Sequence, residues 1–199
     1  MRPSVTAVFP AFTAAFEGCT SYLYLDVKGL VTTGRGNLVD PMPAALALPW
    51  KRHDGSLASS TEVAEAWQTV KGAQWLCQHG GAAFATLTTL RLDPADVDAL
   101  TLAKLRQNDA ALAGRFPFWD DLPASAQLAV HSLAWACGPA FHFPRLEAAL
   151  ADRDWATCAD ECQMDETGNP GLRPRNAADR ALFAACLDPG DPDTISGWP

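Results

Sequence analysis

Residues 17–37 read EGCTSYLYLDVKGLVTTGRGN, and this stretch decides how the chain around it is interpreted. Two short runs rich in aromatic and β-branched residues, 22–25 and 30–33, lie on either side of a turn that contains glycine. Runs of this composition flanking such a turn are typical of a β-hairpin. The sequence therefore predicts an antiparallel pair of strands here.

The length of the turn determines whether Asp26 and Thr32 lie on the same face of this hairpin. A two-residue turn would put them on opposite faces. A three-residue loop over 27–29, with Gly29 in a left-handed bulge, pairs Asp26 with Leu30 and keeps Thr32 on the Asp26 face. Glycine stands where that loop requires it, so we expect the three-residue loop.

The residues before the hairpin predict a short helix that ends at Glu17. Apolar residues recur near the helical period at Val5, Val8, Phe9, Phe12 and Phe16. Pro10 interrupts this run, so the helix is expected to begin only around it, and Gly18 is expected to cap its end. Glu17 would then lie at the negative end of the helix dipole between apolar neighbours, a setting that raises a carboxyl pKa.

Glu17, Asp26 and Thr32 supply two carboxyl groups and a hydroxyl at a helix end and across a hairpin. This is the minimum set for cleaving a glycosidic bond with water, because one acid protonates the leaving oxygen while the other group holds the attacking water. Each residue alone is an ordinary surface residue by type. The combination, in this order and followed by Gly-x-Gly, indicates a catalytic segment.

The spacing Glu-x8-Asp-x5-Thr followed by Gly-x-Gly resembles the catalytic segment of the phage-type (T4-like) lysozymes. A nearly uncharged run at 126–138 resembles the long central helix of that family. An arginine-rich stretch at 171–183 is similar to its Gly-Leu loop and following helix. The resemblance covers roughly residues 8–40 and 93–186, and we interpret 41–92 as an insertion.

The resemblance implies an α+β, mainly α fold. The expected architecture is a single lysozyme-like domain over 1–199, in which a small β-hairpin lobe and a helical lobe flank a cleft. The abundance of alanine also favours helical structure. Within the insertion, Ser59 is expected to cap a helix, and residues 188–199 are expected to form an extended tail pinned by Trp198.

Four residues are predicted to bind the substrate: Arg35, Asn37, Trp50 and Arg175. Asn37 stands where many family members carry histidine, so one supporting ion pair is lost. Trp50 is expected to expose its ring at the rim of the cleft, where aromatic rings stack on sugars. The family places an arginine beside the general acid, so Arg175, or failing it Arg173, is expected to pair with or lie near Glu17.

The resemblance implies a muramidase that hydrolyses the β-1,4 bond between N-acetylmuramic acid and N-acetylglucosamine in bacterial peptidoglycan. Two alternatives stay open. One is a different glycan-cleaving enzyme on a related fold, such as a lytic transglycosylase or a chitinase. A transglycosylase needs no second carboxylate, so Asp26 and Thr32 count against it. The other is a non-catalytic wall-binding module, which should have lost a catalytic residue, whereas here none is lost.

The net charge and the histidine and cysteine content of the chain limit which molecules it is expected to bind. The net charge of −8 argues against nucleic acid as a partner. The 4 histidines are scattered and the 6 cysteines form no Cys-x-x-Cys pair, so we expect no metal and no cofactor. The cysteines are expected to be buried, reduced thiols, and a nucleophile pair of Cys137 with His131 or His142 is the enzymatic alternative. We expect a monomer that acts on bacterial peptidoglycan, with an immunity protein as a further partner if the chain is an interbacterial effector.

No stretch approaches the roughly eighteen apolar residues that a membrane-spanning helix needs. Arg2 and the apolar residues after it resemble a signal peptide, but cleavage there would approach or remove Glu17, so none is expected. The chain is therefore expected to be made in the cytoplasm. It would act in the periplasm or cell wall after holin action, cell lysis or contact-dependent export.

Overall fold

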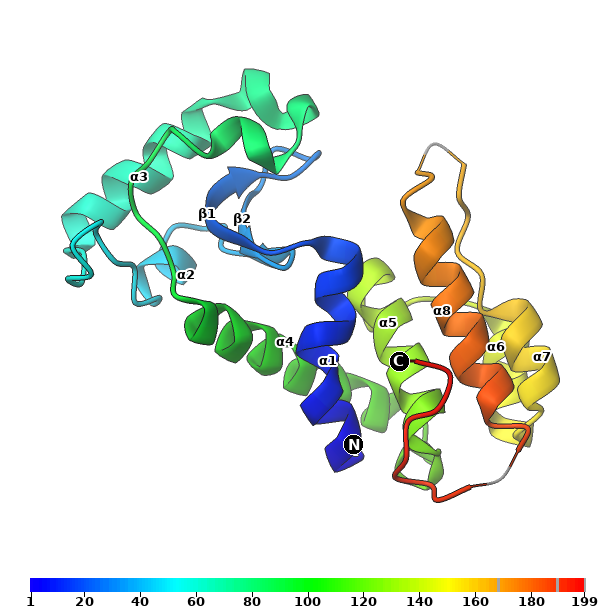
Figure 1. Cartoon of the computed structure of the whole chain (residues 1–199). Coiled ribbons are helices and arrows are strands. Elements are labelled where there is room, and N and C mark those ends of the chain that lie inside the picture. The colour runs from blue at the N-terminus through cyan, green and yellow to red at the C-terminus, as the bar shows by residue number, and fades with distance from the viewer. Residues whose placement is uncertain (168, 189, 199) are drawn as a thin grey trace. The chain divides into compact units, whose positions relative to one another are not determined.

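The structure is a computed structural model that describes residues 1–167, 169–188 and 190–198. The chain divides into two compact units, the helical unit (Met1–Phe16 with Leu102–Pro199) and the hairpin unit (Glu17–Thr101). Figure 1 labels their α-helices and the strands β1 and β2. Helices dominate and the described strands form a small antiparallel sheet, so the predicted α+β, mainly α class is confirmed. The finer lysozyme-like arrangement stays a prediction.

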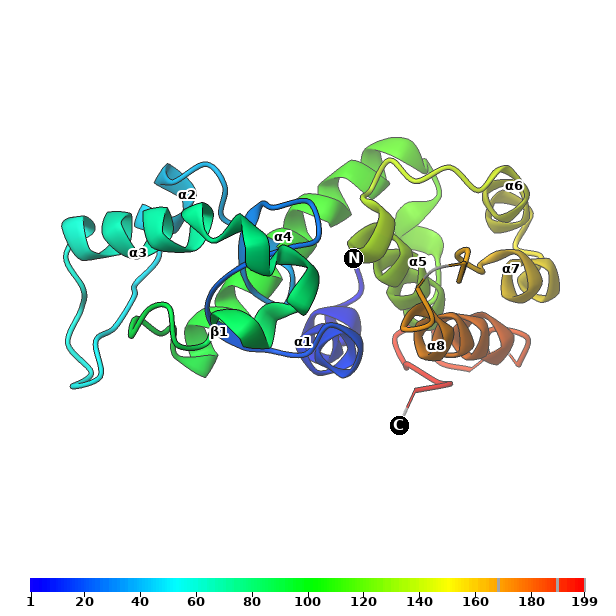
Figure 2. The same ribbon diagram turned by 90° about the horizontal axis from the view of Figure 1, so that it is seen from above.

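The hairpin unit is built on a three-stranded antiparallel sheet with the order β1-β2-β3. Its strands are β1 (Thr20–Leu25), β2 (Val31–Gly34) and β3 (Asn37–Leu38). Its helical elements are α2 (Pro43–Leu46), α3 (Ser60–Gly72) and the 3₁₀ turns η1 (Gln74–His79) and η2 (Gly81–Phe84). Both 3₁₀ turns and α3 pack against β1, as Figure 2 shows. Residues 41–92 thus supply most of the core partners of the sheet.

Helix α3 begins as the sequence predicts. The hydroxyl of Ser59 accepts the Glu62 N–H at 3.3 Å, and the Glu62 carboxylate accepts the Ser59 N–H at 2.8 Å. This reciprocal capping box satisfies two backbone donors that a helix start leaves without partners. Val63 and Val70 on one face of the helix are buried, so capping and burial together account for the position of α3.

The end of α3 holds the loop between β1 and β2. The ammonium of Lys71 donates to the Gly29 carbonyl at 2.9 Å and to the Asp40 carboxylate at 2.7 Å. The side-chain amide of Gln74 also donates to Gly29, at 3.3 Å. The segment interpreted from the sequence as an insertion therefore braces the loop that follows Asp26.

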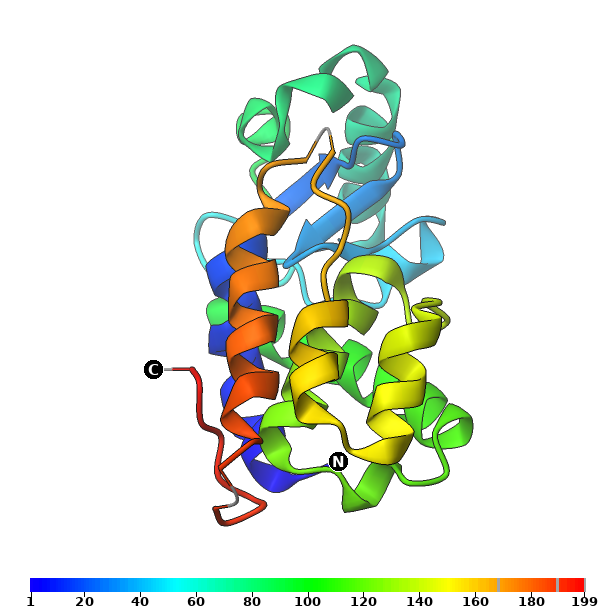
Figure 3. The same ribbon diagram turned by 90° about the vertical axis from the view of Figure 1, so that its right-hand side faces the viewer.

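The helical unit contains α1 (Pro3–Glu17) up to Phe16 and the larger part of α4 (Pro94–Arg115). It continues with η3 (Trp119–Asp121), α5 (Ala124–Cys137), α6 (Pro144–Asp152), α7 (Trp155–Glu161) and α8 (Leu172–Ala185). Helix α8 packs against α5 and α7, and α6 packs against α7, as Figure 3 shows.

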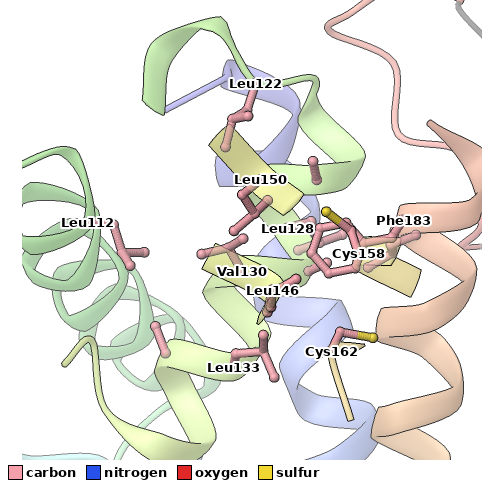
Figure 4. Packing of buried hydrophobic residues seen from close by; sticks show 14 of the residues in the cluster. Leu112, Leu122, Leu128, Val130, Leu133, Leu146, Leu150, Cys158, Cys162 and Phe183 are labelled. Carbon is pink, nitrogen blue, oxygen red and sulfur yellow. The ribbon is translucent and has the colours of Figure 1, made fainter. Parts of the chain in front are cut away.

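Helix α5 is the centre of this unit. All its residues from Ala124 to Ala134 are buried, as its near lack of charge predicts for a helix surrounded by others. Figure 4 shows Leu128 and Leu133 among the buried side chains of this core, together with Leu146 from α6 and Phe183 from α8. The core of the helical unit is thus a layer of leucines and aromatic rings around α5.

The predicted start of α1 near Pro10 is wrong. The helix begins at Pro3 and runs through Pro10, which lies inside it. A proline in a helix interior removes one hydrogen bond and costs roughly 3 kcal/mol. Val5, on an earlier turn of α1, and Phe9, next to Pro10, are both fully buried. Their burial offsets the cost of the proline.

None of the helices in the described part of the chain is long and apolar enough to cross a membrane.

Candidate functional site

The hairpin of β1 and β2 has the register that a three-residue loop requires. Tyr24 lies opposite Thr32, and the Asp26 N–H donates to the Leu30 carbonyl at 3.0 Å. Gly29 has a φ of 71° and donates its N–H to the Asp26 carbonyl at 2.9 Å. The predicted loop is therefore confirmed. Because side chains alternate along a strand, Tyr24, Asp26 and Thr32 project from one face of the hairpin.

The carboxylate of Asp26 is half-buried and only one of its oxygens is engaged. Its Oδ1 accepts the backbone N–H groups of Lys28 and Leu30, each at 2.9 Å. Its Oδ2 accepts no hydrogen bond from any residue that the structure describes. The loop thus fixes the side chain through one oxygen and leaves the second available to a water or substrate hydroxyl.

Thr32 is buried, and its hydroxyl already donates a hydrogen bond within the protein. Its Oγ1 donates to the Leu30 carbonyl at 3.1 Å. A hydroxyl that donates elsewhere still has oxygen lone pairs with which to accept. On the face it shares with Asp26, Thr32 is therefore an acceptor.

Tyr24 belongs to the same face and was missed by the sequence analysis. Burial, together with the negative charges of Glu17 and Asp26, raises its pKa from 10.0 to about 12. The phenol therefore stays neutral and lies within electrostatic reach of both carboxyl groups. Its position two residues before Asp26 on a predicted strand could have indicated this placement, because strand residues two positions apart share a face.

Glu17 is the last residue of α1, and Gly18 follows it with a φ of 67°, as predicted for a C-terminal cap. Glu17 is exposed, and so is Cys19, so the apolar surroundings expected for this carboxyl group are not present. The ring of Phe16 packs against Phe12 instead. Neighbouring residues on a helix point about 100° apart, so Phe16 does not cover Glu17.

Arg35 and Asn37, predicted to bind substrate, are both buried, Arg35 in the turn after β2 and Asn37 at the start of β3. The Asn37 Oδ1 accepts the Arg35 N–H at 3.1 Å, across a turn that needs Gly34 at a φ of 64°. The Arg35 guanidinium donates to the Thr101 hydroxyl at 3.0 Å and pairs with Asp98 at 2.7 Å. These contacts tie the hairpin to the start of α4, and the burial of both side chains does not fit direct substrate contact.

The expectation that Trp50 exposes its ring is wrong. Only 1% of the residue is exposed, and its indole N–H donates to the Ala45 carbonyl at 2.9 Å. Trp75 in η1 has the exposed indole instead, at 72%. Gln78, one 3₁₀ turn later and so on the same side of η1, donates to the Val27 carbonyl at 3.4 Å. An aromatic ring therefore lies exposed near the loop that follows Asp26.

Lys51 and Arg52, the two cationic residues that follow Trp50, are engaged in ion pairs. Lys51 pairs with Asp93, and the Arg52 Nε donates to Glu62 at 2.7 Å. The Arg52–Glu62 pair lines a surface groove of about 640 Å³ along α3. That groove contains none of the three predicted catalytic residues, so we assign it no part in their chemistry.

Arg175 is buried in the helical unit. Its guanidinium donates to the carbonyl and the hydroxyl of Ser132, each at 3.3 Å, and lies 4.9 Å from the ring centroid of Phe16. This burial does not fit direct substrate contact. The predicted pairing with Glu17 stays a prediction, although Arg175 does lie against the residue that precedes Glu17. Arg173 pairs with Glu166 at 3.1 Å.

Asp179 lies one turn after Arg175 on α8 and is fully buried. Neither carboxyl oxygen has a hydrogen-bond partner within 3.5 Å among the described residues. Burial raises its pKa from 3.8 to about 7, while Ser132 and the charge of Arg175 act in the opposite direction. The folded chain therefore binds a proton here that the unfolded chain releases above pH ~4.

This proton makes stability depend on pH. Because the folded pKa is raised, the contribution of Asp179 is complete below pH ~4 and is lost as the pH rises to about 7. Asp179→Asn should remove that loss, which amounts to at most about 4 kcal/mol for a shift of this size. Urea unfolding at pH 5 and pH 8 measures the difference. Asp152→Asn, at an exposed position of α6, is the matched control and should follow the wild type. Equal pH dependence in the Asp179 variant and wild type would contradict the assignment.

The surroundings of Cys137 do not favour a cysteine nucleophile at this position. All six are unbonded, but Cys19 and Cys137 are exposed, which corrects the expectation that all are buried. Burial raises the pKa of the Cys137 thiol, with a smaller opposing effect from Arg175, so its reactive thiolate is disfavoured. His131 is fully buried, 3.4 Å from Asp109. No group of three or more His, Cys, Asp or Glu side chains in the described residues is arranged to hold a metal ion.

Comparison of the sequence with models of known protein families and with curated proteins finds no match.

Proposed function

We propose that this chain is a glycoside hydrolase that cleaves the β-1,4 bond between N-acetylmuramic acid and N-acetylglucosamine in bacterial peptidoglycan. The observation that carries the proposal is the hairpin register, which places Tyr24, Asp26 and Thr32 on one face. Both Glu17 and Asp26 contribute to the raised pKa of the Tyr24 phenol, which supports a role for the two carboxyl groups at this face. A pair of carboxyl groups with room for water is what glycoside hydrolysis requires.

Glu17 is assigned as the general acid. It ends a helix, is followed by the Gly18 cap and is exposed, so a polymer can reach it. Its proton passes to the glycosidic oxygen as the bond from that oxygen to the anomeric carbon breaks. The leaving sugar therefore departs as a neutral alcohol.

Asp26 and Thr32 are assigned to the attacking water. The water donates one hydrogen to the open Oδ2 of Asp26 and the other to the Thr32 hydroxyl, whose own proton is held by Leu30. Both hydrogens are then directed at the protein and a lone pair is directed away, toward the anomeric carbon. Asp26 takes the proton as the new carbon–oxygen bond forms, and the configuration at that carbon inverts.

Tyr24 is assigned a supporting role between the two carboxyl groups. With a pKa of about 12 it stays protonated near neutral pH. It is therefore a constant hydrogen-bond donor and does not compete with Glu17 as the acid.

The proposal is tested by treating purified peptidoglycan with the wild-type chain. Turbidity should fall, and mass spectrometry of the soluble fragments should find N-acetylmuramic acid at the new reducing ends. Ends of 1,6-anhydro-muramic acid would instead identify a lytic transglycosylase. Cleavage of chitin oligomers with no effect on peptidoglycan would identify a chitinase. Binding to peptidoglycan without release of any fragment would identify a wall-binding module.

A further inference from the structure

Residues 191–198, which we name the strap, follow α8 and return across the helical unit (Figures 1 and 3). The Pro192 carbonyl accepts the N–H of Ala124, the first residue of α5, at 2.8 Å. Ser125 and Ser196 form a reciprocal pair, because the Ser125 hydroxyl accepts the Ser196 N–H at 2.9 Å and donates to its carbonyl at 3.1 Å. The strap is thus attached to the start of α5 through its own backbone groups, which bond to the Ala124 N–H and the Ser125 hydroxyl.

Gly197 brings the strap directly onto the backbone of α8. Its φ is 86°, which side-chain-bearing residues rarely adopt. A Cβ at this position would lie 2.5 Å from the Ala181 carbonyl oxygen and 3.2 Å from the Cα of Leu182. No backbone atom can move aside as a flexible side chain would, so this contact requires glycine.

Trp198 places its indole against the last turns of α1. Its ring centroid lies 4.8 Å from that of Phe12 and 5.7 Å from that of Phe16, and those two rings are 5.1 Å apart. Such separations are typical of favourable aromatic pairs. The Arg175 guanidinium lies over the Phe16 ring, at 4.9 Å. Phe16 is therefore held by both the strap and α8, and the next residue along the helix is Glu17.

We infer that Trp198 is a positioning residue, which holds the last turn of α1 through Phe16 and thereby aims Glu17 at the glycosidic oxygen. The inference rests on the proposed function, because it names what orients the acid. The need for such a brace follows from the helix itself. The C-terminal turn of a helix lacks onward hydrogen bonds and frays, and the glycine cap after Glu17 adds no side-chain contact. The Trp198 and Phe12 rings restrain that turn where the backbone does not.

The test compares two pairs of variants with the wild-type full-length chain. Trp198→Ala removes the indole, and Trp198→Phe keeps an aromatic ring in its place. Gly197→Ala introduces the Cβ that α8 does not admit, whereas Gly190→Ala makes the same change where no heavy atom lies within 4 Å. Amide hydrogen exchange of residues 12–17 reports on the last turn of α1. Fragment release from peptidoglycan, measured as kcat and KM across pH, reports on the acid.

Trp198→Ala and Gly197→Ala should accelerate exchange in the last turn of α1 and lower kcat by roughly 10–100-fold, with KM little changed. The limb of the pH–rate profile that reports the pKa of the general acid should also shift. Trp198→Phe and Gly190→Ala should stay close to the wild type. Phe143→Ala, which removes an aromatic pair between Phe141 and Phe143 elsewhere in the helical unit, should lower the Tm but leave kcat and the pH profile unchanged.

Two results would overturn the inference while leaving the proposed function intact. One is unchanged exchange in the last turn of α1 when Trp198 is removed. The other is faster exchange with kcat and the pH profile preserved, which would make the strap a purely structural clamp. If the wild-type chain released no fragments from peptidoglycan, the proposed function would fail first, and the positioning role would fall with it.

Discussion

Replacing Glu17 with glutamine is expected to lower kcat for peptidoglycan cleavage by roughly 10²–10⁴-fold, the usual effect of removing a general acid. Glutamine has the size and hydrogen-bonding capacity of the protonated acid but has no proton to transfer. Because glutamine keeps the length of the side chain and its hydrogen-bonding groups, the change should leave the fold intact. Fragment release measured by mass spectrometry gives the rate, and an unchanged Tm shows that the loss comes from the chemistry.

Glu65→Gln is the matched control for this experiment. Glu65 is an exposed glutamate of α3 in the same unit, and the substitution makes the same chemical change. Its rate should equal that of the wild type. Near-complete activity in the Glu17 variant would show that another group protonates the leaving oxygen, and the assignment of the acid would have to be abandoned.

The second large effect is expected for Asp26→Asn, again a loss of roughly 10²–10⁴-fold in kcat. Asparagine keeps an oxygen that can accept the two loop N–H groups now held by Oδ1, so the hairpin should keep its register. Its nitrogen replaces the open Oδ2 and cannot take a proton from water. The variant therefore separates the chemistry from the loop geometry, which Asp26→Ala would not do.

Asp54→Asn provides a closely matched control. Like Asp26, Asp54 accepts hydrogen bonds through Oδ1 from the residue two positions later. The Ser56 N–H donates to it at 2.9 Å and the Ser56 hydroxyl at 2.6 Å. It should retain the wild-type rate. If both aspartate variants retained activity, Asp26 would be a turn residue and nothing more.

The configuration of the first product tests the same assignment from the substrate side. If Asp26 and Thr32 hold the attacking water, proton NMR of freshly released reducing ends should show the α form from the β-linked glycan before mutarotation. A first-formed β product would instead mean that Asp26 attacks the sugar directly as a nucleophile.

Local geometry was readable from the sequence because neighbouring residues determine it. Gly29 at the third loop position predicts the bulge, and with it the face that Asp26 shares with Thr32. Ser59 and Glu62 predict the start of α3, and Gly18 predicts the end of α1. In each case the decisive hydrogen bond or dihedral angle involves residues no more than four positions apart, so no distant contact can be missing from the prediction.

Burial was decided by the tertiary structure, because it depends on partners far along the chain. Pro10 stays inside α1 since the apolar side chains around it are buried against distant helices. Trp50 was expected at a surface, but it is buried in the core cluster of the hairpin unit, to which β1, α3 and the segment after η2 also contribute residues. The contact of Trp198 with Phe12 and Phe16 joins residues more than 180 positions apart. The sequence determined which turn carries the two catalytic candidates of the hairpin, and only the packing of remote segments determined which of the other predicted residues face solvent.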